Sequence, residues 1–278
     1  MIQRGGFISS MPPGVRQLLT INVVMFFLTI IVRSTGVNLN QWLGLHLVGS
    51  QMWGPWQYIT SMFMHGGFGH LFFNMFALFM FGRVLEQVWG TKRFIIYYMI
   101  CGLGAGMLHN FVSWYEFNKV LEPCREFAMN ASPEALYDVA KHLGDGLFKK
   151  DVIFGFIDQW QAEPGNSLYL AQAKSMVSEI ESTYNTIVEN TTTIGASGAV
   201  FGILLAFGML FPNTEMYIMF LPIPIKAKYF VAIYAFIELF AGVQQIPGDN
   251  VAHFAHLGGM IVGFVLLKIW KMRRNSFY

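Results

Sequence analysis

The chain has 278 residues, of which 54% are hydrophobic and only 12% are charged, and its mean hydropathy is +0.46. A water-soluble domain carries about a quarter charged residues, so most of this chain's surface is not expected to face water. The net charge of +2 comes without a basic patch, which argues against a nucleic-acid-binding protein. The two cysteines, Cys101 in an apolar run and Cys124 in a polar stretch, are not expected to form a disulfide.

Six apolar runs have about the length that a membrane-spanning helix needs, which is roughly 17–25 residues. In chain order they cover residues 18–32, 70–88, 94–114, 195–211, 229–243 and 251–270. Because a span must satisfy its own backbone hydrogen bonds in lipid, the predicted fold is an all-α membrane protein with six transmembrane helices. No removable signal peptide is expected, since no apolar run precedes Leu18.

Residues 115–190 differ in composition from the rest of the chain, because they hold 12 of the 16 acidic residues. Within them, residues 167–188 have apolar side chains at spacings of three and four, which predicts an amphipathic helix, and residues 135–148 form a second candidate. We therefore expect one membrane domain, made of residues 1–114 (helices 1–3) and 191–278 (helices 4–6). A folded, helical, extracytoplasmic insertion at 115–190 interrupts it.

Lysine and arginine in the short loops gather on one side of the predicted bundle, and the long insertion is discounted because such segments cross regardless of charge. With the N-terminus inside, the outer loops hold only Arg33. The inner side holds Arg4, Arg16, Arg83, Lys92, Arg93, Lys226, Lys228, Lys268, Lys271, Arg273 and Arg274. Both termini are therefore predicted to be cytoplasmic, and helices 2, 4 and 6 all begin at the outer face.

A serine and a histidine lie at the outer ends of two of these helices: Ser197 opens the fourth and His256 the sixth. Small residues follow both at helical spacing, which lets two helices pack closely. They are Gly198, Gly202 and Ala206 after Ser197, and Gly259 and Gly263 after His256. Because a hydroxyl and a nearby imidazole are the minimum for nucleophilic catalysis, we predict Ser197 as nucleophile and His256 as its base. Taken singly, each residue also has a structural interpretation: a serine bonded to its own helix, or a buried histidine.

The second helix supplies candidate donors for an oxyanion. His70 and Asn74 are four residues apart, so they share one helical face, and the backbone N–H of Ser197 at a helix start is a third donor. Asn74 alone would be interpreted as a helix-packing residue. His65 precedes the second helix, and His253 lies three residues before His256 in the sixth; both are expected to support the site without acting in catalysis.

Acidic residues are rare in the predicted spans. No Asp lies in any of them, so a dyad is predicted in preference to a triad. Glu86 is expected to bond donors of neighbouring helices, and Glu238 is expected to be protonated or paired. His65 with His70, or His253 with His256, could in principle bind a metal, but no Cys or carboxylate is expected near either pair, so neither a metal nor a cofactor is predicted. The motifs of zinc and aspartyl intramembrane proteases are absent.

Together these motifs resemble the rhomboid family of intramembrane serine proteases, in its six-helix bacterial form. They are His65…His70-x-x-x-Asn74, Gly82-x-x-x-Glu86-x-x-x-Gly90, Gly195-Ala-Ser197-Gly198 and Ala255-His256-x-x-Gly259-x-x-x-Gly263. The resemblance implies a Ser197–His256 dyad and an oxyanion site from His70, Asn74 and the Ser197 backbone, opening to the outside of a bacterial inner membrane. It implies supporting roles for Gly195 and Gly198.

The same resemblance implies the substrates and how they reach the site. They are single-pass membrane proteins, cut at small residues near the outer end of a helix that can unwind. Lateral access lies between helices 2 and 5, with residues 244–250 as a cap. The only other expected partners are membrane lipids.

The sequence departs from the rhomboid pattern in two places, and two other functions remain as alternatives. Trp56-Gln57 stands where many rhomboids carry Trp-Arg, and the insertion, which we expect to cover the site or recruit substrate, has no counterpart in the minimal form. A non-proteolytic rhomboid-like protein that binds transmembrane helices would be expected to lose the serine or the histidine. A transporter or channel would carry polar residues through the full depth of the bundle.

Overall fold

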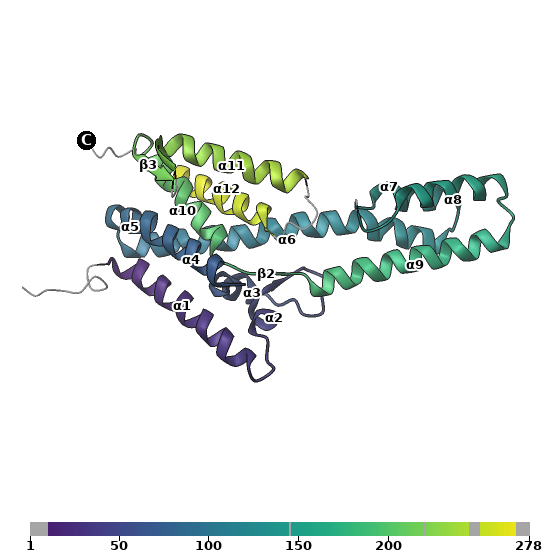
Figure 1. Cartoon of the computed structure of the whole chain (residues 1–278), viewed down its shortest axis with the longest axis horizontal. Helices are drawn as coiled ribbons and strands as arrows, with labels where there is room; N and C mark the ends of the chain where they lie inside the picture. Colours follow the sequence, from purple (N-terminus) through teal and green to yellow (C-terminus); the bar gives the residue numbers. More distant parts are fainter. Residues whose placement is uncertain (1–10, 145, 219–220, 245–250, 271–278) are drawn as a thin grey trace, which may run out of the picture. The chain divides into compact units, whose positions relative to one another are not determined.

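The computed structural model describes residues 11–144, 146–218, 221–244 and 251–270, which are mostly helical (Figure 1). This confirms the predicted helical membrane fold. The chain divides into two compact units, one made of Met1–Leu45, Met52–Asn110 and Thr192–Tyr278, the other of His46–Gln51 and Phe111–Thr191. Of the sequence features above, Arg4, Lys271, Arg273, Arg274 and the proposed cap at 245–250 lie outside the described residues.

The first unit contains the apolar helices. In chain order its elements are α1 (Pro13–Arg33), α2 (Leu39–Leu43), α3 (Gln57–Thr60), η1 (Ser61–Phe63), α4 (Phe68–Ala77), the π-helical turn η2 (Leu78–Gly82), α5 (Arg83–Trp89), the first half of α6 (Thr91–Met129), α10 (Ser197–Leu210), β3 (Glu215–Ile218), β4 (Leu221–Lys226), α11 (Ala227–Gln244) and α12 (His253–Ile269). Two short strands, β1 (Leu45–His46) and β2 (Thr192–Thr193), lie where the chain passes between the units.

Four helices of the described chain are long and apolar enough to cross a membrane: Pro13–Arg33, Phe68–Trp89, Thr91–Met129 and Ala227–Gln244. The predicted fourth and sixth spans are the shorter apolar helices α10 and α12, of 14 and 17 residues. At 1.5 Å per residue these are about 21 and 26 Å long, below the roughly 30 Å of a bilayer core. The third span is longer than predicted, because α6 continues to Met129.

One departure from an all-helical unit follows α10. Strands β3 and β4 form an antiparallel hairpin in which Glu215 faces Lys226 and Tyr217 faces Pro224. The sequence analysis treated these residues as a loop. Proline cannot continue a helix, and the aromatic and β-branched residues around it suit a strand, so a hairpin is the local solution.

The outer surfaces of the apolar helices carry large hydrophobic side chains. On α11, for example, Phe236, Phe240 and Val243 are each more than half exposed. A water-soluble protein rarely exposes contiguous apolar area on this scale, whereas lipid accommodates it. The protein is therefore a multi-pass membrane protein.

Helix α10 is the most enclosed helix of the first unit. Eleven of its 14 residues are buried, on all of its faces, and it packs against α12, α11 and η2. Figure 1 shows α10 and α12 side by side. A helix that is apolar on every side belongs in a protein interior, which explains why its sequence has no polar face.

A buried carboxylate joins the start of α1 to the second span. Glu86 is 3% exposed, and its two oxygens accept hydrogen bonds from the backbone N–H groups of Gly14 and Val15, each at 2.7 Å. The hydroxyl of Thr91 donates a third bond at 2.7 Å. The first N–H groups of a helix have no partner within it, so Glu86 satisfies two of those of α1 and places a negative charge at its positive end.

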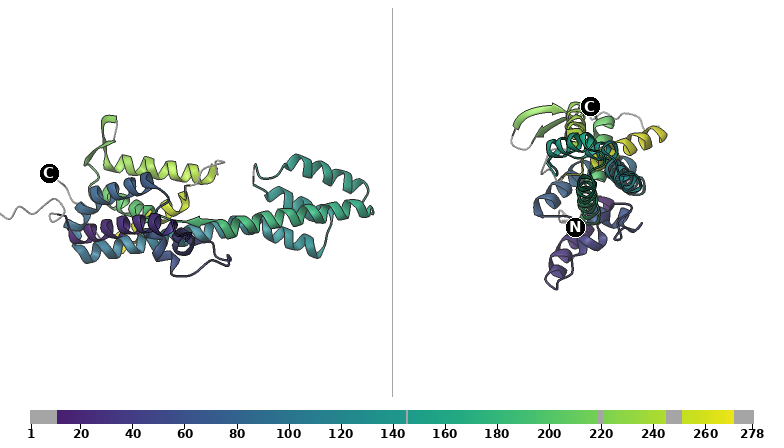
Figure 2. Two further views of the ribbon diagram at one scale, coloured as in Figure 1. Left: turned by 60° about the horizontal axis from the view of Figure 1, so that its bottom comes forward. Right: turned by 90° about the vertical axis from the view of Figure 1, so that its right-hand side faces the viewer.

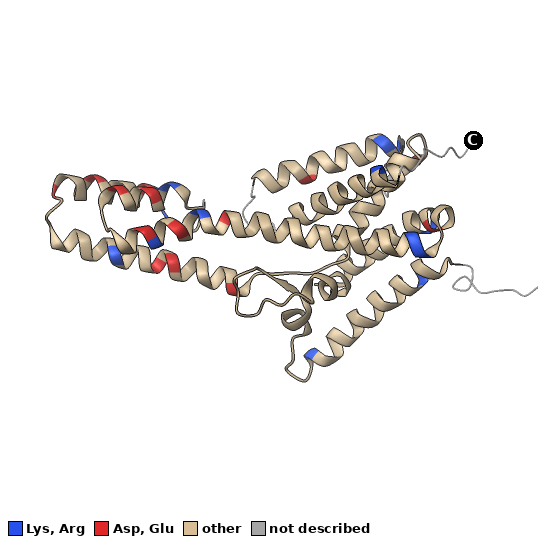
Figure 3. Ribbon diagram, turned by 180° about the vertical axis from the view of Figure 1, so that it is seen from behind, with Lys and Arg blue, Asp and Glu red and all other residues tan. Residues whose placement is uncertain are grey.

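The second unit is a small helical domain with its own core. It comprises the second half of α6 with α7 (Pro133–His142), α8 (Lys150–Ala162) and α9 (Ser167–Asn190), all visible in Figure 2. All four helices contribute to one apolar core, which contains Phe127, Leu136, Trp160 and Ile180. Figure 3 shows the acidic residues gathered on these helices, which agrees with a surface that faces water.

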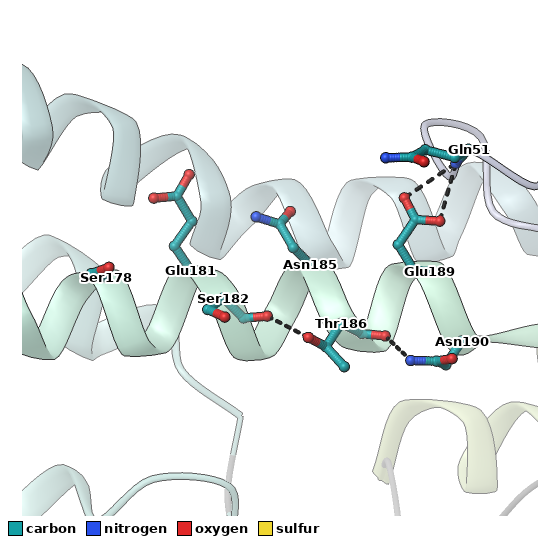
Figure 4. A pocket seen from close by; sticks show the side chains of 8 residues that line it. All are labelled: Gln51, Ser178, Glu181, Ser182, Asn185, Thr186, Glu189 and Asn190. Atoms are coloured by element: carbon teal, nitrogen blue, oxygen red, sulfur yellow. Dashed lines mark hydrogen bonds between the residues drawn. The ribbon is translucent and has the colours of Figure 1, made fainter.

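Residues 46–51 also belong to this unit, through the end of α9. Glu189 accepts hydrogen bonds from the Ser50 hydroxyl at 2.8 Å and from the backbone N–H of Gln51 at 3.1 Å (Figure 4). The neighbouring polar pocket of about 700 Å³ is lined by Ser, Thr, Asn, Gln and Glu side chains. The described residues that line it include no histidine, cysteine, lysine or arginine, so this pocket is a weaker candidate for an active site.

Replacing Glu86 by Gln should lower the free energy of unfolding by about 2–4 kcal/mol, because a charged acceptor of two buried backbone donors is lost. Thermal unfolding in detergent would measure this change in the free energy of unfolding. The matched control is Glu122→Gln, since the Glu122 side chain is 58% exposed and pairs with Arg125. Its effect should stay within about 0.5 kcal/mol. Equal effects of the two substitutions would contradict the assigned role.

Candidate active site

A glycine shapes the turn that leads into α10. Gly195 has φ of +132°, which favours glycine, and its N–H donates to the Ser61 carbonyl at 2.9 Å. A Cβ atom added there would lie 2.7 Å from Nε2 of His70 and 3.7 Å from Oγ of Ser197. The turn therefore lets the His70 ring approach the serine.

Glycines at the contact between α10 and α12 let the two backbones touch. A Cβ atom added to Gly259 would overlap the carbonyl oxygen of Gly198, and one added to Gly202 would lie 3.0 Å from the carbonyl oxygen of Gly259. On α6, Tyr97 donates its hydroxyl to the Gly202 carbonyl at 2.9 Å, and a Cβ at Gly263 would overlap that hydroxyl. The small-residue stripes thus lie at one contact and hold the two helices at a separation that larger residues would increase.

Ser197 and His256 meet at the end of this contact that lies at the N-termini of α10 and α12. Nε2 of His256 lies 2.8 Å from Oγ of Ser197, within hydrogen-bond distance. The Phe201 ring, one turn after Ser197 on α10, stacks on the imidazole with ring centroids 4.1 Å apart and planes at 7°. His256 is 9% exposed, so packing on α10 fixes the plane of a ring that is almost fully buried.

A carboxylate occupies the opposite side of the same imidazole. Oε2 of Glu238 on α11 lies 2.9 Å from Nδ1 of His256 and 2.6 Å from Nδ1 of His253. Glu238 is 6% exposed. The sequence analysis expected no carboxylate near this histidine pair. It was wrong, because 15 residues and a change of helix separate Glu238 from His253 in the chain.

These three side chains also form the candidate metal group found among the described residues, with ligand atoms within 4.8 Å of one another. Ligand atoms around a tetrahedral zinc, at about 2.0 Å from the metal, stand roughly 3.3 Å apart. The carboxylate–imidazole distances of 2.6 and 2.9 Å are shorter than this and match direct hydrogen-bonded or ionic contacts. The arrangement fits a carboxylate held between two imidazoles better than a metal centre.

The remaining predicted site residues are His70, His65 and Asn74. The His70 ring packs over Gly195, and His65 lies against it with ring centroids 5.0 Å apart. His65 is buried, and desolvation, followed by the charge of His70, lowers its pKa to about 4, so it is neutral near pH 7. Asn74 is also buried, and its side-chain amide donates to the carbonyl of His70 at 3.0 Å.

Two residues near the serine were missed from the sequence. Phe201 follows Ser197 by four residues, a spacing that places it on the same helical face, but an aromatic residue in an apolar span carries no distinguishing signal. Glu238 did carry a distinguishing signal in the sequence, since an acidic residue inside an apolar span is costly and marks a functional candidate. Its partners on another helix were not evident from the sequence.

The arrangement is chemically that of an activated serine. The hydroxyl lies at the start of α10, where the first backbone N–H groups have no partner within the helix and the dipole is positive. Nε2 of His256 is within reach of the hydroxyl proton, and His70 adds a ring nitrogen near the same side. A nucleophile, a base and candidate oxyanion donors are thus gathered in one place.

A multi-pass membrane fold with a serine and a histidine at the N-terminal ends of two closely packed helices defines the class of this protein. The chain belongs to the rhomboid family: the model of the rhomboid domain matches residues 52–117 and 167–273. The gap between the matched segments, residues 118–166, falls within the second unit, so the family model does not describe that part of the unit.

Similar proteins come from bacteria and eukaryotes. An uncharacterized mitochondrial rhomboid protein of Schizosaccharomyces pombe is 26% identical over 227 residues, covering 78% of this chain and 52% of that protein. The rhomboid protease AarA of Providencia stuartii is 30% identical over 36% of this chain and 37% of its own. The rhomboid protease GluP of Bacillus subtilis is 35% identical over 20% of this chain and 11% of its own. The chain thus spans about half the length, or less, of these curated relatives.

Replacing Gly259 by Ala should separate α10 from α12, because the added methyl group overlaps the Gly198 carbonyl. We expect reaction of Ser197 with a fluorophosphonate probe to slow at least about tenfold, since small misplacements of reacting groups cost large factors in rate. Gly155→Ala is the control, because Gly155 is a helical glycine with open space around its Cβ position. Unchanged labelling of Gly259→Ala would contradict the role of the backbone contact.

Proposed function

We propose that this protein is an intramembrane serine protease in which Ser197 is the nucleophile and His256 the general base. The observation that carries the proposal is the 2.8 Å contact between Oγ of Ser197 and Nε2 of His256. It joins two helices that run through the membrane domain. A serine hydroxyl is a weak nucleophile alone, and an imidazole at hydrogen-bond distance is the usual means of activating it.

The reaction proceeds by acyl transfer. Oγ of Ser197 attacks the scissile carbonyl carbon as Nε2 of His256 takes the hydroxyl proton, and the carbonyl oxygen becomes an oxyanion. The C–N bond then breaks as His256 returns the proton to the leaving amine. Water repeats the sequence on the acyl ester and releases Ser197. The backbone N–H of Ser197 and the His70 ring are the proposed oxyanion donors, with Asn74 holding the backbone at His70.

The short length of α10 supports a reaction inside the membrane. Its 14 residues cover about 21 Å, so a helix that ends at one face of a 30 Å core begins roughly 9 Å below the other. Ser197, its first residue, is then accessible to a transmembrane segment that unwinds near its end. We therefore propose single-pass membrane proteins as substrates.

The lysine and arginine distribution supports a topology with both termini in the cytoplasm and Ser197 toward the outer face. We propose the bacterial inner membrane as the location, with the 115–190 region outside, where it covers the site or recruits substrates. Since catalytic activity in a rhomboid fold requires both the serine and the histidine, their retention favours a protease over a non-proteolytic protein that binds transmembrane helices.

Labelling by a fluorophosphonate probe and cleavage of a single-pass substrate in vesicles should both fall at least about 1000-fold in Ser197→Ala and His256→Ala, because the residues act as a unit. Ser34→Ala and His142→Ala are matched controls. Ser34 bonds its own helix at Ile31, and His142 is an exposed residue of α7. Both controls should keep wild-type activity. A folded wild type that neither labels nor cleaves would refute the protease and favour the helix-binding alternative.

A further inference from the structure

We propose that Glu238 is the third member of a Ser197–His256–Glu238 triad, in which its carboxylate positions His256 through Nδ1. This rests on the proposed function, and it departs from the dyad expected from the sequence. Glu238 touches neither the serine nor the substrate's reacting atoms, so it is a positioning residue and not a catalytic one.

The two ring nitrogens of His256 face two different groups. Nε2 lies 2.8 Å from Oγ of Ser197, and Nδ1 lies 2.9 Å from Oε2 of Glu238. These are the separations expected when a carboxylate, an imidazole and a hydroxyl act in series. Nδ1 of His256 is buried and has no hydrogen-bond partner of good geometry among the described residues. Oε2 of Glu238 is close enough to become its acceptor after a small rotation of the side chain. Such bonds are often poorly aligned before substrate binds.

The carboxylate decides which nitrogen carries the proton. A carboxylate only accepts hydrogen bonds, so its contact with Nδ1 favours the tautomer that is protonated there. Nε2 is then left with a free lone pair, which is the form that can take the proton of Ser197. Once that proton is transferred, the negative charge of Glu238 stabilises the imidazolium.

His253 holds the carboxylate in place from the other side. Its Nδ1 lies 2.6 Å from the same oxygen, Oε2. His253 and His256 are one turn apart on α12, so Glu238 links α11 to two successive turns of that helix. Helices α11 and α12 lie close together at this point, as a Cβ atom added to Gly242 of α11 would lie 3.2 Å from Cβ of His253.

The position of Glu238 is costly without such a role. It is buried in the middle of an apolar helix whose neighbouring side chains Phe236, Ile237, Leu239 and Phe240 are exposed and suited to lipid. Acidic residues in spans are rare and face the bundle interior when present. Other titratable groups interact electrostatically with this pair: the charge of His256 acts on His70 of α4 and His109 of α6, and that of Glu238 acts on Tyr234 of α11.

The test is the pH dependence of substrate cleavage by the full-length protein, with Glu238→Gln beside the wild type. We expect kcat to fall about 10- to 1000-fold with KM within about twofold, because the change removes positioning and not substrate binding. The acidic limb of the kcat/KM profile should move to lower pH by about one unit, since the imidazolium loses a stabilising charge. A purely structural role would not move that limb. Glu179→Gln, at an exposed position of α9, is the matched control.

A second measurement is made on the wild type and does not depend on whether Glu238→Gln folds. Nitrogen NMR of histidine-labelled wild type, with His256→Ala to assign the signals, should show His256 protonated at Nδ1. The other tautomer would overturn the triad, as would a wild-type kcat and acidic limb in Glu238→Gln while Ser197→Ala is inactive. Unchanged kcat and an unchanged acidic limb in Glu238→Gln would contradict only the triad, and the proposed protease function would stand. A folded wild type without activity refutes both.

Discussion

The close backbone contact between α10 and α12 is the constraint on which the rest of the membrane unit depends. Gly198, Gly202 and Gly259 leave no side chain between the two helices, so the helices meet over several turns. Without hydrophobic attraction between helices in lipid, association relies on this close packing and on interhelical hydrogen bonds such as that from Tyr97 to the Gly202 carbonyl. The positions of Ser197 and His256 follow from it, because each lies near the N-terminal end of one of the two helices. The same contact encloses α10, and a short enclosed helix can begin inside the membrane.

Two buried glutamates show how this unit uses its few charges. Glu86 accepts bonds from the first N–H groups of α1, and Glu238 lies between two imidazoles of α12. Neither is paired with a lysine or arginine in these contacts. Each is stabilised by donors that would otherwise be unsatisfied in an apolar surrounding, which is the condition under which a buried carboxylate is tolerated. Glu86 joins helices far from Ser197, and Glu238 adjoins His256, the proposed base.

The sequence predicted most of what depends on local spacing. The apolar runs gave the helices, and the spacing of small residues after Ser197 and His256 indicated their contact, since helical periodicity places residues three and four apart on one face. Interactions between elements distant in sequence were not predictable in this way. Glu238 stood out as unexplained, but its pairing depends on how α11 packs on α12. The hairpin β3–β4 was missed because its strands are short and contain prolines, and the length of α6 because its polar second half resembles a loop in composition.

The low polarity around His256 determines how much each contact matters. Electrostatic interactions strengthen as the effective dielectric constant falls, so a carboxylate 2.9 Å from an almost fully buried imidazole acts on it more strongly than it would at a surface. The Phe201 ring both restricts the imidazole plane and excludes water from one of its faces. Helix packing therefore fixes where His256 lies, stacking fixes its plane, and the carboxylate selects its tautomer. Packing of α12 on α10, a ring of α10 and a carboxylate of α11 supply these constraints, so the proposed activity of Ser197 requires the three helices to be assembled together.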